Sequence, residues 1–228
     1  MADAPNVRFD IASFGELLSD PSRVAMLLSL MHGLTRPATE LAHVAGVSQA
    51  TASAHLKKLL GGALVRVEQL GRHRYFQLAG PQVADALEAM ALHAPPRKPP
   101  RPQDPERRIF THARTCYQHL AGRLGVAWLS ALQRQRLLHA GAGGLELSPL
   151  GVARCADAGL VAPEWPAGKP CLDWTERQNH LGGPLGSLLT QAMLEQQWLV
   201  RHRAGRAVRL TTRGRRKLTG LGVELPEG

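Results

Sequence analysis

The stretch Arg36–Leu78, RPATELAHVAGVSQATASAHLKKLLGGALVRVEQLGRHRYFQL, decides the expected fold. Its pattern predicts two helices joined by a tight turn and followed by a two-stranded hairpin with a basic tip. Two helices joined by a turn of about three to four residues, with the second helix available to the DNA major groove, form a helix-turn-helix. The hairpin makes this a winged version, and we therefore expect the segment to bind duplex DNA.

The turn between the two helices carries clear local signals. The first helix is expected to begin at Pro37, because proline lacks the N–H that would be unpaired there, and to bury Leu41 and Val44. Gly46 can adopt positive φ after the helix end, and Ser48 can cap the helix that follows. These signals predict where the first helix ends and where the second begins.

The second helix, expected over about residues 49–60, has one apolar and one polar face. Ala52, Leu56, Leu59 and Leu60 have helical spacing and are expected to face the core. The polar face offers hydroxyls and amides, which can meet base edges, and then lysines, which can bind phosphates. The predicted DNA-binding residues are Gln49, Thr51 and Ser53 for base edges, His55 near the groove wall, Lys57, Lys58, Arg72 and Arg74 for phosphates, and Ser48 and His73.

The hairpin after this helix is expected to act as the wing. Its strands are predicted over residues 64–68 and 74–78, with Gly71 at the turn, and its tip is cationic as contact with a phosphate backbone requires. Two lysines on a surface helix are also typical of a solvated face, and winged helices also serve as protein-docking modules. The order of turn, capped helix and basic hairpin favours DNA binding over both alternatives.

Motifs within about residues 8–94 resemble the arsenic-repressor (ArsR) family of bacterial transcription regulators. They are SQATASAHLKKL at 48–59, Leu64-Val65, GRHRY at 71–75 and FGELLSDPSRVAML at 14–27. The resemblance implies a homodimer built mainly from the first helix and the helix after the wing, Gln82 to His93, and repression that an effector relieves. It also implies the long form of the family, which carries an extra C-terminal domain.

The chain departs from the family pattern in two places. The family usually has Ala-Gly before the Leu-Val of the wing, whereas this chain has Gly61-Gly62-Ala63, so we expect the positive-φ residue at Gly62. The family's best-known metal signature places cysteines in the first helix of the helix-turn-helix, but residues 39–44 contain none. Asp85 and His93 match the zinc-type dimer site poorly, and the familiar metal sensing of the family is therefore not expected.

Composition and cysteine count bound the class of protein. The chain has 228 residues, 44% of them hydrophobic, with ten Trp, Phe and Tyr residues together, which suits two small helical domains. No apolar run reaches the roughly 18 residues of a membrane span, and the N-terminus lacks the pattern of a secretory signal. The odd set Cys116, Cys155 and Cys171 then indicates reduced thiols and a cytoplasmic protein that does not associate with membranes.

The formal net charge of +10 is concentrated in the C-terminal part of the chain. Residues 1–96 hold eight basic and eight acidic residues, although residues 48–78 are locally positive. The densest cluster contains no acidic residue and consists of Arg201, Arg203, Arg206, Arg209, Arg213, Arg215, Arg216 and Lys217. Such a cluster is typical of a solvated surface, and direct contact with DNA beside the operator is the alternative.

A proline-rich segment divides the chain. Residues 95–105 contain six prolines and are expected to form a semi-rigid linker. We therefore expect a winged helix-turn-helix domain for DNA binding and dimerisation over residues 1–94 and a regulatory domain over residues 106–228. The expected fold class is mainly α with small β-hairpins.

The second domain contains an internal repeat. The motif HLAGRLG at 119–125 matches HLGGPLG at 180–186 at five of seven positions. Each copy continues into an amphipathic helix, a hairpin and a capped helix, which predicts two winged-helix-like repeats over about 112–160 and 173–222. Chance similarity in a chain rich in Leu, Gly and Ala is the alternative.

Histidines and cysteines of the second domain are candidates for sensing. A metal site on one helix face could use His112, Cys116 and His119, with Cys171 or His93 as the fourth ligand. His119 has a repeat partner at His180, and the other ligands have no such partners. This favours a structural role for His119, and the sequence predicts neither a bound metal nor a cofactor.

Two further sensing chemistries are open. Cys116 and Cys171 could form a thiol switch, with Arg114 activating the first thiol, or could be small buried residues. An organic effector could bind in a pocket near a tryptophan. The candidate tryptophans are Trp128, Trp174 and Trp198, for which core positions are more typical.

No catalytic pattern accompanies these residues. Cys171 and Arg177 have the C-x5-R spacing of phosphatase loops, but Asp173 and Glu176 would repel the anion that such a loop binds. The sequence therefore predicts a transcription regulator rather than an enzyme. We expect a homodimeric repressor that binds an inverted-repeat operator and is released by a small-molecule, redox or metal effector. The alternative is a protein-docking winged helix with a basic C-terminal half that binds nucleic acid without sequence preference.

Overall fold

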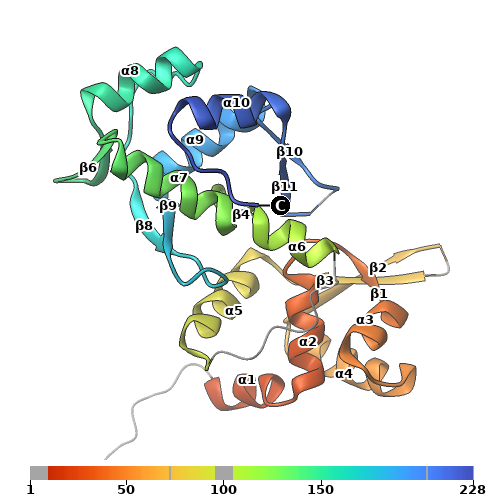
Figure 1. Cartoon of the computed structure of the whole chain (residues 1–228). Coiled ribbons are helices and arrows are strands. Elements are labelled where there is room, and N and C mark those ends of the chain that lie inside the picture. The colour runs from red at the N-terminus through yellow and green to blue at the C-terminus, as the bar shows by residue number, and fades with distance from the viewer. Residues whose placement is uncertain (1–9, 72, 96–104, 204, 228) are drawn as a thin grey trace, which may run out of the picture. The chain divides into compact units, whose positions relative to one another are not determined.

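The computed structural model describes residues 10–71, 73–95, 105–203 and 205–227. The chain forms two compact units, Met1–Glu88 and Ala89–Gly228 (Figure 1). The predicted linker, residues 95–105, lies outside the described residues except at its two ends. The fold class is confirmed as mainly helical with small antiparallel sheets.

The first unit is a winged helix-turn-helix. Its elements are α1 (Ile11–Leu18), α2 (Pro21–Leu30), β1 (Arg36–Pro37), α3 (Ala38–Ala45), α4 (Gln49–Gly61), β2 (Val65–Leu70) and β3 (His73–Leu78), followed by α5 (Pro81–His93), which crosses the unit boundary. The three strands form one antiparallel sheet in the order β1-β3-β2. Leu41 on α3 and Leu56 and Leu59 on α4 are almost fully buried and join the helices to α2 and the sheet.

The start of α2 is held by its own capping residue. Asp20 accepts hydrogen bonds from the backbone N–H groups of Ser22 and Arg23, which are unpaired at a helix N-terminus. The buried Arg23 side chain turns back and donates to the carbonyl oxygens of Glu16 and Leu17 at the end of α1. One arginine therefore connects the two helices that precede the helix-turn-helix.

The first helix of the motif differs from its prediction at two residues. Pro37 precedes the helix in an extended conformation (φ −71°, ψ 157°) and pairs with Tyr75 as part of β1. Its fixed φ suits a strand end as well as a first helical turn, and the pairing with β3 decides between the two. Val44 is 42% exposed and the buried position belongs to Ala42, so the apolar face is rotated from the one expected.

The backbone before the wing also differs from expectation. Gly62 has φ −88°, and the positive φ of 53° belongs to Ala63, directly before Leu64. The second unit repeats this geometry at Arg136 (φ 55°) and Gln197 (φ 57°), each directly before the first buried residue of a hairpin. The left-handed residue thus occupies the same position ahead of each of these three hairpins, although its side chain differs from one to the next.

We expect Ala63→Gly to stabilise the protein by about 0.5 to 1 kcal/mol, because glycine adopts the left-handed conformation without the steric cost of a Cβ atom. Chemical unfolding of the two proteins measures the difference. The matched control is Ala54→Gly within α4, where the same exchange is expected to cost about 1 kcal/mol. Destabilisation by both exchanges would contradict the expectation that the left-handed conformation of Ala63 costs stability.

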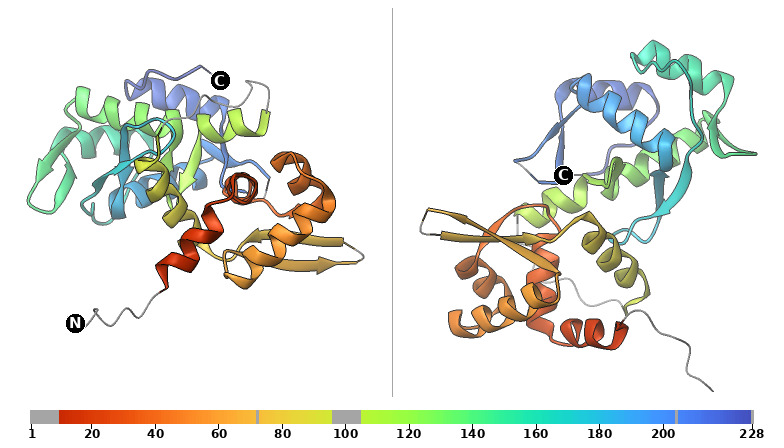
Figure 2. Two further views of the ribbon diagram at one scale, coloured as in Figure 1. Left: turned by 90° about the horizontal axis from the view of Figure 1, so that it is seen from below. Right: turned by 180° about the vertical axis from the view of Figure 1, so that it is seen from behind.

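After the end of α5, the second unit consists of α6 (Pro105–His112) and two copies of a hairpin-helix-hairpin-helix arrangement (Figure 2). The first copy consists of β4 (Arg114–Cys116), β5 (His119–Ala121), α7 (Gly122–Arg134), β6 (Leu138–Gly141), β7 (Gly144–Leu147) and α8 (Pro149–Ala158). The second consists of β8 (Lys169–Leu172), β9 (Asn179–Gly182), α9 (Gly183–Glu195), β10 (Leu199–Arg201), β11 (Val208–Leu210) and α10 (Thr212–Gly220). Each copy has, ahead of the predicted helix, hairpin and helix, a further hairpin that the sequence pattern did not indicate.

The repeated motif explains how the two copies pack together. α7 packs on β9 and α9 packs on β5, so each copy's helix lies against the other copy's strand. Within its own copy, Gly125 approaches the Leu120 carbonyl so closely that a Cβ atom would lie 2.4 Å from its oxygen, and Gly186 has the same relation to Leu181 at 2.2 Å. The final glycine of each motif is therefore required for close helix-strand contact.

The core of the second unit is shared by both copies. Trp128 of the first copy, Trp198 of the second copy and Cys155 are almost fully buried in it. The two tryptophans therefore occupy core positions, which the sequence favoured as the more typical place for them. Within the described residues, no helix combines the length and the apolar character that crossing a bilayer requires.

Candidate functional site

The polar face of α4 is exposed to solvent. Ala52, Leu56 and Leu59 are buried, and Leu60 is half-buried. The predicted DNA-contacting side chains that are exposed on the opposite side are Gln49, Thr51, Ser53, Lys57 and Lys58. The helix therefore presents amides and hydroxyls in its first turns and ammonium groups further along, the order that base edges and phosphates require.

Ser48 positions the N-terminus of α4. Its hydroxyl accepts a hydrogen bond of 3.1 Å from the Thr51 N–H and lies 2.9 Å from the Thr51 hydroxyl. Gly46 ends the preceding helix in the left-handed conformation (φ 66°), as predicted. The turn thus sets the direction of α4. Ser48 caps the helix and also holds the Thr51 side chain on its polar face.

His55 lies differently from its predicted position near the groove wall. Its side chain is only 14% exposed, and Nε2 lies 3.8 Å from an Asp20 carboxylate oxygen. Nδ1 lies 3.4 Å from the Arg23 guanidinium. The ring therefore links α4 to the start of α2, because the helix spacing places residue 55 beside the buried face rather than on the exposed one.

The wing is described on both sides of its tip. Leu70 pairs with His73 at the end of the hairpin, and Gly71 has φ 62° in the turn. Arg74 is exposed, with its guanidinium carbon 5.5 Å from the centre of the Phe76 ring. Of the other predicted tip residues, Arg72 and the side chain of His73 lie outside the described part of the chain.

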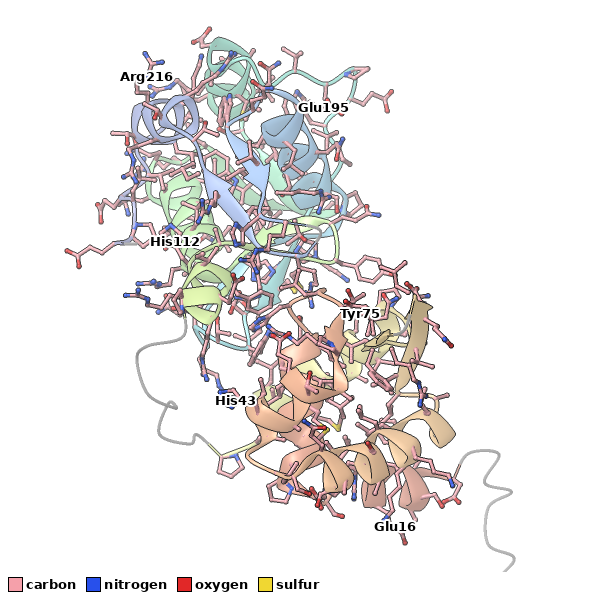
Figure 3. The ribbon with its side chains drawn as sticks, turned by 90° about the vertical axis from the view of Figure 1, so that its right-hand side faces the viewer. Glu16, His43, Tyr75, His112, Glu195 and Arg216 are labelled. Carbon is pink, nitrogen blue, oxygen red and sulfur yellow. The ribbon has the colours of Figure 1, made fainter. Side chains whose placement is uncertain are left out.

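The predicted helix face of His112, Cys116 and His119 does not exist. α6 ends at His112 (Figure 3). Cys116 and His119 lie opposite each other in the hairpin β4-β5. The spacing was helical, but the repeat requires a hairpin in front of each helix, and this interrupts the helix after His112. His112 is consequently separated from the other two residues.

The structure instead brings Cys116 and His119 together with two further side chains. Cys171 and His180 are partners in the hairpin β8-β9, just as Cys116 and His119 are in β4-β5. One ligand atom from each of the four residues lies within 4.8 Å of the other three, and His180 Nε2 lies 3.1 Å from His119 Nδ1. We call this group the Cys-His cluster.

The interpretation that His180 lacks equivalent partners was therefore wrong. Cys171 is the counterpart of Cys116, but the sequence conceals this because the two hairpins have different lengths. Two residues separate Cys116 from His119, whereas eight separate Cys171 from His180. A constant offset between the repeats aligns the histidines and misses the cysteines.

A buried ion pair adjoins the Cys-His cluster. Arg114 donates to an Asp173 carboxylate oxygen at 2.8 Å, and both side chains are at most 1% exposed. The other carboxylate oxygen accepts the Gly122 N–H at 2.7 Å and lies 3.4 Å from His180 Nδ1. Arg114, which the sequence offered as a possible activator of the Cys116 thiol, is thus paired with Asp173.

The ionisation states of these groups follow from burial and from their neighbours. Burial opposes the charged form of Asp173, but His180 and Arg114 hold the pKa of this carboxyl well below its usual range. Burial likewise opposes the charged form of His180, but Asp173 and Cys116 raise the pKa of its imidazole. Burial, with a smaller contribution from His180, lowers the pKa of His119 to about 4, which leaves a neutral imidazole, the form that binds metals.

The basic cluster of the second unit extends over β10, β11 and α10. Arg206 is half-buried and donates to the Thr115 carbonyl, and Arg203 forms an ion pair of 3.0 Å with Glu106. Arg216 on α10 is exposed (Figure 3). Part of the cluster therefore stabilises the fold, and the remainder is open to solvent.

A pocket of about 480 Å³ lies in the second unit between α7 and the hairpin β8-β9. Val126, Leu129 and Ser130 line one side, and Gln178 and Asn179 line another. Neither Trp128, Trp174 nor Trp198 lines it, so this pocket is not the one near a tryptophan that was considered as an effector site.

Comparison with known proteins places the chain among transcription regulators. Residues 18–68 match the model of a helix-turn-helix domain family. The chain is 40% identical over 213 residues to the HTH-type transcriptional regulator YdfF of Bacillus subtilis, covering 90% of this chain and 94% of that protein. It is 35% identical over 77 residues to the HTH-type transcriptional regulator CmtR of Mycobacterium bovis, covering 34% of this chain and 64% of that protein.

Solved structures similar to the chain cover about a third of it. The homodimeric winged helix-turn-helix DNA-binding domain of Mb0332 from Mycobacterium bovis, described as a possible ArsR-family regulator, has 29% identity and a TM-score of 0.35, covering 36% of this chain and 76% of that one. The transcriptional repressor BigR from Xylella fastidiosa has 21% identity and a TM-score of 0.35, covering 38% of this chain and 88% of that one.

Proposed function

We propose that this chain, which belongs to the HTH-type transcriptional regulators, is a homodimeric cytoplasmic repressor of the ArsR type that an effector releases from its operator. Each protomer would place α4 in the major groove of one half of an inverted repeat. The observation that carries the proposal is the exposed row of Gln49, Thr51 and Ser53 with Lys57 and Lys58 beyond it. The second unit would bind the effector, whether a small molecule, an oxidant acting on Cys116 and Cys171, or a metal.

The uncovered apolar residues of α1 support the homodimer. None of the residues of α1 is buried, and Ile11 is 73% exposed. Phe14, Leu17 and Leu18 are only half-buried within one chain. A second copy would cover these side chains, and removing an apolar helix face from water favours association.

A titration of the protein on fragments of its own upstream DNA, at two salt concentrations, tests the proposal. We expect a protected inverted repeat and a specific affinity that falls with added salt. The rival is a protein-docking winged helix with sequence-blind binding through the C-terminal basic cluster. Binding that ignores sequence and disappears in the double variant Arg215→Gln/Arg216→Gln would favour this rival.

Gln49→Ala is expected to reduce the discrimination between the operator and a half-site variant by about 1 to 3 kcal/mol, because it removes an amide that can bind a base edge in two places. Competition binding with both DNA fragments measures this difference. Arg74→Ala is the comparison: loss of a phosphate contact should weaken binding to both fragments equally and reduce the salt dependence. Equal losses on all sequences for both variants would contradict the assignment of Gln49 to base contact.

A further inference from the structure

We propose that the Cys-His cluster is a binding site for one zinc-class transition-metal ion, with Cys116, His119, Cys171 and His180 as its four ligands. The site lies wholly in the second unit and goes beyond the proposed DNA binding. It keeps Cys116, His119 and the candidate fourth ligand Cys171 of the set considered from the sequence, and His180 takes the place of His112.

The geometry of the four ligand atoms suits a tetrahedral ion. Zinc bonds of about 2.0 to 2.3 Å to nitrogen and sulfur place neighbouring ligand atoms about 3.3 to 3.8 Å apart. The four atoms of the cluster lie within 4.8 Å of one another, and the two imidazole nitrogens are 3.1 Å apart. Small rotations of the side chains are therefore sufficient to bring all four ligands onto one ion.

The fold brings the ligands together symmetrically. Each hairpin contributes one cysteine and one histidine at paired positions, and β5 lies next to β9. A Cβ atom on Gly186 of α9 would lie 3.1 Å from the Cβ of His119, and one on Gly125 of α7 would lie 3.4 Å from the Cβ of His180. Each histidine is thus packed against the helix of the other copy, which limits its freedom.

Asp173 completes the arrangement around His180. Its carboxylate oxygen lies 3.4 Å from His180 Nδ1, on the side of the ring away from the cluster, while Nε2 faces His119. Histidines that bind metals commonly orient their second nitrogen toward a carboxylate in this way, which fixes the tautomer and the ring direction. Asp173 is therefore a positioning residue for the site rather than one of its ligands.

The donor set selects the chemical class of the ion. Two thiolates and two imidazoles prefer zinc and similar borderline-soft ions over magnesium or calcium, which prefer oxygen ligands. Four protein ligands leave no open position for a substrate, which is the pattern of structural and sensory zinc sites. A bound ion would connect the first hairpins of the two copies and so stabilise the second unit.

The test is a titration of the reduced full-length protein with Co²⁺, a coloured substitute for zinc. We expect one equivalent to bind per chain, with the visible bands of tetrahedral cobalt and a thiolate-to-cobalt charge-transfer band, and Zn²⁺ to displace it. Cys116→Ser and Cys171→Ser should each remove about half of the charge-transfer intensity and weaken binding at least tenfold. Thermal unfolding of each variant shows whether it is folded.

Cys155→Ser is the matched control, because it removes the third thiol of the chain. Cys155 is fully buried in the core, where burial raises the pKa of its thiol to about 11. The variant is expected to keep the complete cobalt spectrum. Absence of cobalt binding by the reduced wild-type protein, or an unchanged spectrum of Cys116→Ser, would overturn the proposal.

A measurement without any substitution makes the test independent of variant folding. X-ray absorption of the zinc-loaded wild-type protein should show two sulfur and two imidazole ligands. A shell without sulfur would overturn the site. Because neither readout involves DNA, the metal site and the proposed operator binding can fail separately.

Discussion

Replacing Lys57 and Lys58 together by glutamine is expected to weaken operator binding by about three orders of magnitude at about 0.15 M salt. Both side chains are exposed on the polar face of α4, and the proposed homodimer presents four of them to phosphates. Each phosphate contact contributes about −0.9 to the slope of log affinity against log salt. Four contacts together raise the affinity by about three orders of magnitude when the salt concentration falls from about 1 M to about 0.15 M, and this electrostatic gain is what the variant is expected to lose.

Operator binding measured over a range of salt concentrations checks this result through the slope as well as the affinity. The matched control is Arg107→Gln/Arg108→Gln, which neutralises two adjacent exposed basic residues on α6, outside the winged helix. The control should retain the wild-type slope. An unchanged slope in the lysine variant, or the same decrease in both variants, would refute the placement of α4 against the phosphate backbone.

Asp173→Asn is expected to destabilise the second unit by about 3 kcal/mol or more. Arg114 and Asp173 form a fully buried ion pair, and removal of one charge leaves the other without compensation in the protein interior. Urea unfolding followed by tryptophan fluorescence measures the effect. All four tryptophans of the chain lie in the second unit, so the signal reports on this unit alone.

Asp157→Asn is the matched control, because Asp157 is exposed on α8 and the same exchange should there change stability by less than about 0.5 kcal/mol. The double variant Arg114→Met/Asp173→Asn should lose less than the sum of the two single losses, since neither charge remains alone. Additive losses would show that the two groups act independently and that the pair is not the source of the effect.

Prediction of the DNA-facing residues from sequence depended on helix periodicity. The exposed positions of Gln49, Ser53 and Lys57 follow from the spacing of the apolar residues of α4, and periodicity over one helix is a local property. His55 was assigned to the same face, but its ring lies against Asp20 and Arg23 of another helix. Spacing alone cannot show that a side chain at the border of a face has a partner elsewhere.

The winged helix-turn-helix could be recognised from the chain itself because its signals act over a few residues. The left-handed turn at Gly46, the cap at Ser48 and the spacing of Leu56 and Leu59 each specify local backbone or one helix face. The left-handed residue before the wing was misplaced by one position, since both Gly62 and Ala63 can occupy it and the hairpin register makes the choice.

The Cys-His cluster is a product of tertiary structure. Cys171 and His180 become neighbours only when the strands β8 and β9 pair across the six-residue loop that joins them. Cys116 and His119 join them only because α7 and α9 each pack on the strand of the other copy. Such contacts depend on which surfaces are buried together, and a linear spacing between repeats does not contain that information.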